Sequence, residues 1–202
     1  MKLILDYISH YKADSSNASL DTLLTYAQAR EYSKLGELFT ASFLVDIASH
    51  FDISCQIRND LQIKDIVSNL LCGRVVAVAY DMGHDFRPAL RQGSKAHWCL
   101  IHGFLYFEEG QGVITNIIDN VRSAESVDIP DLLEDQVWLI ISHGKSKRRN
   151  LWSWVELKAS TRNLVTVDQR LSDETYVIPN DRRLDGLRDQ WVIFNVHTSR
   201  ST

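Results

Sequence analysis

The chain has 202 residues, a formal net charge of −4, 45% hydrophobic and 24% charged residues, and three cysteines. This length and composition suit one globular domain with a substantial core, and the acidic balance gives no reason to expect nucleic acid as a partner. The apolar runs are too short to span a bilayer, so no membrane partner is expected. An odd number of cysteines at unrelated spacings indicates reduced thiols in the cytoplasm.

The first third of the chain is predicted to be helical. Residues 1–11 carry apolar side chains at helical spacing but have no capping residue before them, which predicts that the sequence is N-terminally incomplete. Two more helices should follow the caps Ser19 and Thr40, with apolar stripes at Leu20, Leu23, Leu24 and Ala27 and at Phe43, Leu44, Ile47, Ala48 and Phe51. A fourth helix is expected over 61–71, with Gly73 at its C-terminal end.

Strand patterns dominate the rest of the chain. Short strands are predicted at 53–57, 75–80, 97–107, 113–118, 137–142, 176–178 and 191–196, and a short amphipathic helix at 152–160. The turn at 110–112 should make 113–118 the antiparallel partner of the strand before it. Helices first and a mainly antiparallel sheet later predict a single α+β domain over 1–202, with a flexible tail at 198–202.

The rest of the chain is organised around the stretch Gln92–Phe107. A long polar loop, 81–95, delivers the chain to His97, which opens an apolar strand. A strand fixes the orientation of a ring while a loop admits substrate, so this is a favourable place for a histidine that transfers protons. A lone histidine at a strand edge is more commonly structural and bonds a nearby carbonyl group.

Other sites find less support. Asp81, His84 and Asp85 have metal-ligand chemistry, but no second cluster completes a coordination shell, so neither a metal nor an organic cofactor is expected. The sequence GKS at 144–146 lacks the glycine that a phosphate-binding loop needs at position 139.

Thiol catalysis needs a thiolate, a histidine that takes its proton, and a group that orients the histidine. Cys55 lies in a strand pattern, Cys72 ends a helix, where the dipole disfavours a thiolate, and Cys99 shares a strand face with His97. We therefore expect three ordinary thiols, none of them a nucleophile.

Five segments in a fixed order nevertheless resemble a known family: GELF at 36–39 with the helix after it, YD at 80–81, KAHW at 95–98, GKS at 144–146 with LW at 151–152, and YVIP at 176–179. They are similar to the actin maturation proteases, which are cysteine aminopeptidases of the C39-like branch of papain-like peptidases. The resemblance covers most of the chain, and KAHW and GKS with LW are its most specific parts.

The resemblance implies a papain-like fold and a cytoplasmic hydrolase that removes the acetylated N-terminal residue of immature actin. Its partner would be the actin N-terminus, free or bound to profilin, and it would need no cofactor. The family nucleophile belongs to a Cys-Gly-Leu type motif at the head of the first helix, which would fall before Met1 of this sequence. The alternative is an inactive pseudoenzyme that binds actin or another peptide.

One catalytic residue carries over by resemblance, His97, as general base and then general acid. Asn116 and Asp119, near the end of the following strand, are candidates for the group that orients it. Because the loop 81–95 should form one wall of the substrate groove, the predicted substrate-binding residues are Asp81, Arg87, Arg91, Lys95 and Trp98. A purely structural interaction module would leave this loop and KAHW without a role.

Overall fold

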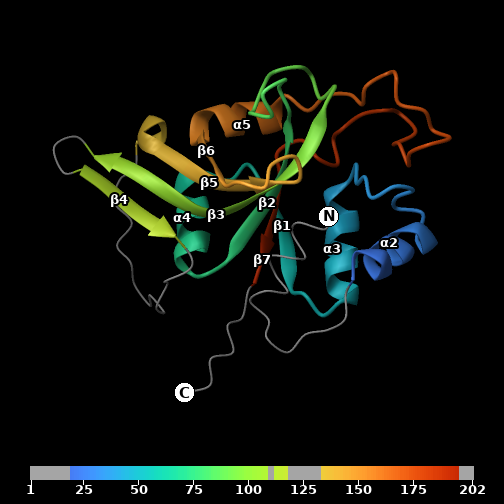
Figure 1. The fold of residues 1–202 in the computed structure, drawn as a ribbon, viewed down its shortest axis with the longest axis horizontal. Helices are drawn as coiled ribbons and strands as arrows, with labels where there is room; N and C mark the ends of the chain where they lie inside the picture. Colours follow the sequence, from blue (N-terminus) through green and yellow to red (C-terminus); the bar gives the residue numbers. More distant parts are fainter. Residues whose placement is uncertain (1–18, 109–111, 118–132, 196–202) are drawn as a thin grey trace.

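A computed structural model describes residues 19–108, 112–117 and 133–195, and Figure 1 shows its arrangement. The predicted helix at 1–11, the tail at 198–202 and Asp119 lie outside the described residues. Within the described part, no helix is long and apolar enough to cross a membrane.

One antiparallel sheet forms the centre of the molecule. Its strands are β1 (Cys55–Asn59), β2 (Val75–Asp81), β3 (Ala96–Glu108), β4 (Gly112–Ile117), β5 (Val137–His143), β6 (Asn150–Ser153) and β7 (Gln190–Phe194). They follow the order β1-β7-β2-β3-β5-β6, with β4 paired to β3. β2 occupies one edge of β3 along Ala96–Ile101, β4 continues that edge along Gly103–Glu108, and β5 lies on the opposite edge. Every side chain of β2 is buried, as its continuous apolar sequence predicts.

Two helices cover one face of the sheet, at the right in Figure 1. They are α2 (Leu20–Ala29), whose first turn is capped by the Ser19 side chain, and α3 (Ala41–His50), which starts after Thr40. Their buried side chains pack with the β-strand residues Val75, Ala77, Leu100, Val192 and Phe194. The predicted helices are confirmed here, and Ser19 caps α2 as predicted, whereas Thr40 occupies the N-cap position of α3 without a side-chain hydrogen bond. Leu20 is 42% exposed and not part of the buried stripe, which in α2 consists of Leu23 and Ala27.

The opposite face is covered by α4 (Ile63–Leu71) and α5 (Trp154–Arg162). Their apolar side chains pack against Val76, Val78, Tyr80, Cys99 and Ile101. Gly73 follows α4 with a φ of 71°, the left-handed conformation that glycine adopts most easily and that its predicted role requires. The fold is therefore α+β, with helices on both faces of an antiparallel sheet.

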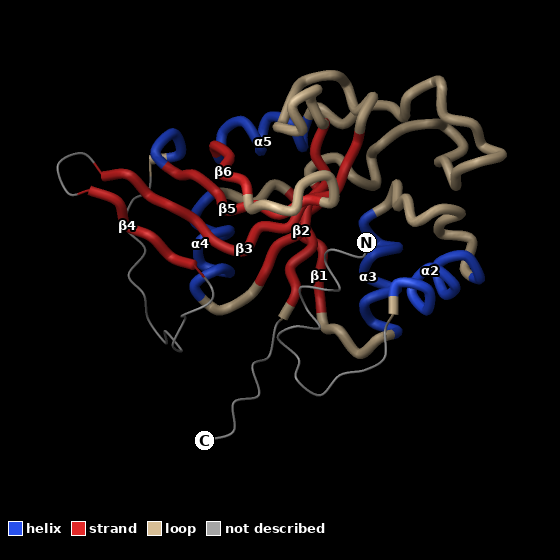
Figure 2. Tube along the Cα trace, viewed as in Figure 1, coloured by secondary structure: helices blue, strands red, loops and turns tan. Residues whose placement is uncertain are grey.

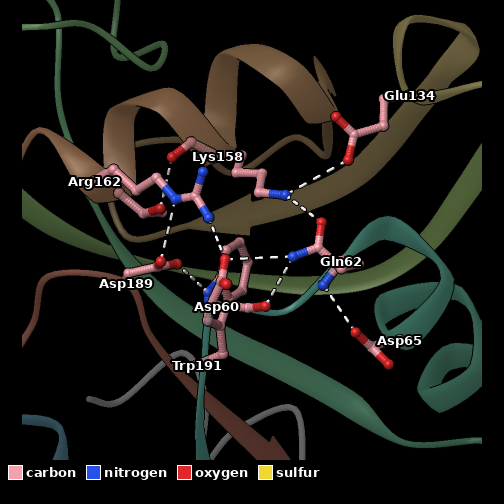
Figure 3. A network of polar contacts seen from close by, with 9 residues as sticks. Asp60, Gln62, Asp65, Glu134, Lys158, Arg162, Asp189 and Trp191 are labelled. Carbon is pink, nitrogen blue, oxygen red and sulfur yellow. Dashed lines mark hydrogen bonds and ion pairs between the residues drawn. The ribbon is translucent and has the colours of Figure 1, made fainter.

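A polar network fixes the edge of α5 to the sheet (Figure 3). Lys158, only 9% exposed, donates to Gln62 Oε1 at 2.8 Å and lies 3.5 Å from Glu134. Arg162 pairs with Asp60 and, through Nε, with Asp189 at 3.1 Å; Asp189 also accepts from Trp191 Nε1 at 2.8 Å. The network thus joins α5 to the turn between β1 and α4 and to the start of β7.

The structure corrects several boundaries. The first strand is 55–59 and not 53–57, and the last helix is 154–162 and not 152–160. The prediction missed β6, and Glu134–Gln136 form a short 3-10 helix. The predicted strand at 176–178 was wrong, because Val177 donates its N–H to the Glu37 carboxylate at 2.9 Å and not to a neighbouring strand. Figure 2 shows the largest group of loops, in tan, at the upper right of the molecule.

Candidate active site around His97

His97 is the second residue of β3 and lies directly opposite Tyr80 of β2. Paired residues in an antiparallel sheet project to the same face, so both rings lie on the face that α4 and α5 cover. Ser160 of α5 holds this end of β2: its hydroxyl donates to the Asp81 carbonyl at 3.0 Å and accepts from the Asp81 N–H at 2.9 Å. The backbone around His97 is therefore fixed by both the sheet and a helix.

The loop 82–95 before His97 is organised by Asp81. The Asp81 side chain is fully buried, and its Oδ2 accepts from the backbone N–H of Arg91 and from that of Gly93 at 3.0 Å. Gly93 has a φ of 89°, and an added Cβ would meet Leu184 Cδ1 at 2.5 Å. Gln92 accepts from Val165 and Thr166, so the segment after α5 buttresses the loop. The loop thus has a defined path up to His97.

Several aromatic rings lie on the face of the sheet to which His97 projects. The loop turns back at Phe86, where the Tyr80 hydroxyl donates to the Phe86 carbonyl at 3.0 Å. His143, the last residue of β5 and 2% exposed, stacks on Trp152 with ring centroids 5.4 Å apart. Its ring is 6.4 Å from Tyr80 and 6.3 Å from Phe86. We call Tyr80, Phe86, His143 and Trp152 the aromatic cluster.

The electrostatics of this site keep His97 neutral. Burial, followed by the positive charge of Lys145 and by His143, lowers the pKa of His97 to about 4. Burial also lowers the pKa of His143. An imidazole with such a pKa carries no charge at neutral pH and keeps a lone pair on one ring nitrogen.

The three cysteines do not supply a thiolate to this histidine. Cys99 points to the same face as His97 but is fully buried, and burial raises its thiol pKa. Burial raises the pKa of Cys55 to about 11, and Cys55 pairs with Phe194, which pairs with Val75. Cys72 is exposed but ends α4, three residues before Val75. Cys55 and Cys72 therefore lie near the Val75 end of β2, whereas His97 lies at the Asp81 end.

The predicted site residues are placed as follows. Lys95 is partly buried and its charge acts on His97, whereas Arg87 is exposed and Arg91 keeps Nη1 buried without a hydrogen-bond partner. Trp98 points to the other face and donates its Nε1–H to the Leu38 carbonyl at 3.0 Å. Asp81, predicted to bind substrate, is buried and holds the loop backbone through its carboxylate.

The strand register places Asn116, a predicted orienting residue, far from His97. It pairs with Phe104, seven positions along β3 from His97, which corresponds to about 23 Å of strand. The structure instead brings His143 and Tyr80 to His97, and sequence reasoning missed both. The detectable signal was a histidine that ends a predicted strand just before a basic turn, but its place opposite β3 depends on strand pairing.

Two hollows lie elsewhere on the described surface. A cavity of about 570 Å³ lies between residues 28–34 and 173–180, and a smaller one of about 190 Å³ adjoins Phe39 and Phe43. Beside them, the Glu37 carboxylate accepts from Ser33 Oγ and from the backbone N–H groups of Lys34, Leu35 and Val177. Burial opposes its ionisation, but the backbone hydrogen bonds lower the pKa of Glu37 overall. Glu37 therefore joins the segment before α3 to the loop before β7.

Among the described residues, no three His, Cys, Asp or Glu side chains gather as metal ligands would. The His97 imidazole lies in a partly buried, positively charged setting and can transfer protons.

Comparisons with known proteins match this chain at modest identity. Residues 4–105, which include His97 and the loop before it, match the family model described as actin maturation protease-like, C-terminal domain. The actin maturation protease of Danio rerio is 28% identical over 199 residues, covering 90% of this chain and 64% of the relative. That of Xenopus tropicalis is 28% identical over 187 residues, covering 88% and 62%, and that of Drosophila melanogaster is 28% identical over 165 residues, covering 79% and 52%.

The chain thus spans about half to two thirds of the length of these relatives. No solved structure matches it.

Proposed function

The chain belongs to the actin maturation protease-like family, and from that premise we propose that it acts in a cysteine-type aminopeptidase that removes the acetylated N-terminal residue of actin. The fold would be the papain-like arrangement of C39-like peptidases, and the compartment the cytoplasm. The observation that carries the proposal is the position of His97. It is a neutral imidazole at the start of a strand of the central sheet, and it lies inside the region that matches the family model.

In the proposed reaction His97 takes the proton of a cysteine thiol, and the thiolate attacks the carbonyl carbon of the acetylated first residue. The carbon–nitrogen bond to the second residue then breaks, and His97 gives its proton to the leaving amine. Water hydrolyses the resulting thioester with His97 again acting as base. Cys55, Cys72 and Cys99 are unsuited by burial or position, so the proposed nucleophile is none of these three thiols.

The positive charge around His97 supports an acidic substrate. Lys145 and Lys95 both act on the histidine, one from the turn after β5 and one from the loop before β3. Immature actin, as the family resemblance implies, begins with acidic residues. Lysines at the rim of a site mainly speed and orient the encounter with such a peptide, at about 1 kcal/mol per exposed pair or less.

The test uses a chimaera in which this chain replaces the region of the Danio rerio protein that it matches. We expect the chimaera to release the acetylated first residue from an N-acetylated actin peptide, measured by mass spectrometry. His97→Ala should reduce turnover by about 10²-fold or more, because it removes the proton-transfer group. His50→Ala, on α3, is the matched control and should keep full turnover. A folded chimaera that does not cleave, or His97→Ala with unchanged turnover, would refute the proposal.

A second candidate is a catalytically inactive protein that binds actin or another peptide. The lack of a suitable thiol among the three cysteines favours it. This candidate predicts that the folded chimaera binds the acetylated peptide without cleaving it.

A further inference from the structure

We infer that His143 is a positioning residue of the His97 site: a second imidazole, held in one tautomer on the adjacent strand, that shapes the surroundings in which His97 takes and releases its proton. The general-base role of His97 rests on the function proposed above, whereas the placement of the two histidines on neighbouring strands does not.

Strand register places the two histidines together. His143 pairs with Cys99, and His97 is two residues before Cys99 on the same strand. Residues two apart on a strand share a face, so His97 and His143 are diagonal neighbours across the β3–β5 pair. Such neighbours have Cα atoms roughly 7–8 Å apart, within reach of aromatic side chains.

The His143 ring has a fixed position and a defined tautomer. It stacks on Trp152 at 27° between ring planes, and its Nδ1 accepts the backbone N–H of Lys145 at 3.3 Å. A neutral imidazole that accepts at Nδ1 carries its proton on Nε2. His143 therefore presents an N–H donor edge to its surroundings, and adding a second proton would break the bond from Lys145.

A charge on His143 disfavours a proton on His97, whereas burial is what lowers the pKa of His143 itself. The charged or titratable groups that act on His97 come from several elements: Lys95 in the loop, His143 in β5 and Lys145 in the turn after it. Tyr80 from β2 and Cys99 from β3 share this face, and both are buried with raised pKa values, so they stay neutral. Within the described part of the chain, no carboxylate acts on the pKa of His97. A proton on either ring thus raises the free energy of a proton on the other.

For a general base this arrangement has a clear consequence. His97 stays unprotonated before reaction, and the proton that it takes from a thiol is returned readily to the leaving amine. His143 acts through His97 and is not required to touch the substrate.

The test is a histidine NMR titration of the 202-residue chain, which needs no enzymatic activity. His143→Phe keeps a ring on Trp152 and removes both nitrogens, and should raise the pKa of His97 by about half a pH unit. His97→Gln should raise the pKa of His143 by the same amount, because coupling between two sites is reciprocal. His50→Gln, on α3, is the control and should shift neither.

A variant that fails to fold does not end the test. His143→Gln also removes the titrating ring, keeps an acceptor for the Lys145 N–H and should shift His97 in the same direction. In the unmodified chain, ¹⁵N shifts at neutral pH should show the His143 proton on Nε2. A His97 titration that is the same in the wild type, His143→Phe and His143→Gln, or a His143 proton on Nδ1, would overturn the inference. Failure of the chimaera to cleave actin peptide leaves this result unaffected.

Discussion

The carboxylate of Asp81 accepts the backbone N–H of Gly93 at 3.0 Å, so the residue that ends β2 also closes the loop that leads into β3. The same Oδ2 accepts from the Arg91 N–H. One buried carboxylate thereby sets the path of the chain just before His97. A substitution at Asp81 should therefore disturb the conformation of the loop more than that of the sheet.

Asp81→Ala should lower the free energy of unfolding by about 1–3 kcal/mol, because it leaves two backbone N–H groups without their acceptor. Urea denaturation measures this loss. Trypsin should also cut faster after Arg87, which is exposed in the loop. His84→Ala, exposed in the same loop, is the control and should change neither measurement. Equal stability and equal trypsin rates for Asp81→Ala and the wild type would show that the carboxylate does not hold the loop.

The three thiols should differ in reactivity toward a disulfide reagent at pH 8. Cys72 is exposed and should react at once. Cys55 should react slowly, since burial raises its pKa to about 11, and Cys99 should react only on unfolding, because it is fully buried. Counting the thiols released before and after adding denaturant, with single Cys→Ser variants to assign them, checks this order. Fast reaction of Cys99 in the native chain would reopen the question of the nucleophile.

Stability should fall as the pH is lowered from 7 to 5. His97 has an ordinary pKa of 6.5 and a folded pKa of about 4, so between these values the unfolded chain binds the additional proton. The stabilising contribution of the neutral ring is therefore complete above about pH 6.5 and is lost progressively toward pH 4. His143 acts in the same direction.

His97→Gln should flatten this part of the curve of unfolding free energy against pH. Asp168, whose pKa is lowered to about 2 by its bonds to Arg170, titrates below this window and does not interfere. A wild-type curve that is level between pH 7 and 5 would contradict the burial of the His97 ring.

Neutralising the lysines beside His97 should weaken the reaction with acidic peptides. In the chimaera, Lys95→Gln with Lys145→Gln should lower kcat/KM severalfold at low salt and flatten its salt dependence, because rim charges act mainly on the encounter rate. Lys147→Gln, exposed in the same turn as Lys145, is the matched control. The effect should vanish for a peptide whose acidic residues are replaced by amides. An equal loss for the neutral peptide would point to damage at His97 and not to charge recognition.

Much of the fold follows from local patterns. β2 is recognisable as a continuous apolar run, and α2 and α3 begin after residues that suit helix caps. β6 escapes prediction because its four residues, Asn150–Ser153, follow a basic turn and are too few to show a period. The segment 176–178 has strand-forming residues, but its backbone is held by the distant Glu37 carboxylate, a contact without a local signal.

The candidate site divides in the same way. His97 is predictable because loop and strand meet there in the sequence. Asn116 appeared suitable because its strand follows directly, but β4 pairs only with the far half of β3. His143 was overlooked because its approach to His97 depends on the register that pairs His143 of β5 with Cys99 of β3. Which residues of two paired strands lie close together is set by the strand register, and that register is determined by the whole fold.

The position of β7 between β1 and β2 has a consequence for how the molecule is made. Cys55 and Val75 are both partners of Phe194, so the gap between two early strands is filled by one of the last described segments. During translation, β1 and β2 are synthesised long before β7. Until β7 is made, the backbone edges of β1 and β2 that pair with it remain unpaired. Closure over such a sequence distance is slow, and open edges invite association between chains. We therefore expect the nascent chain to depend on chaperones until β7 has been synthesised and has paired with β1 and β2.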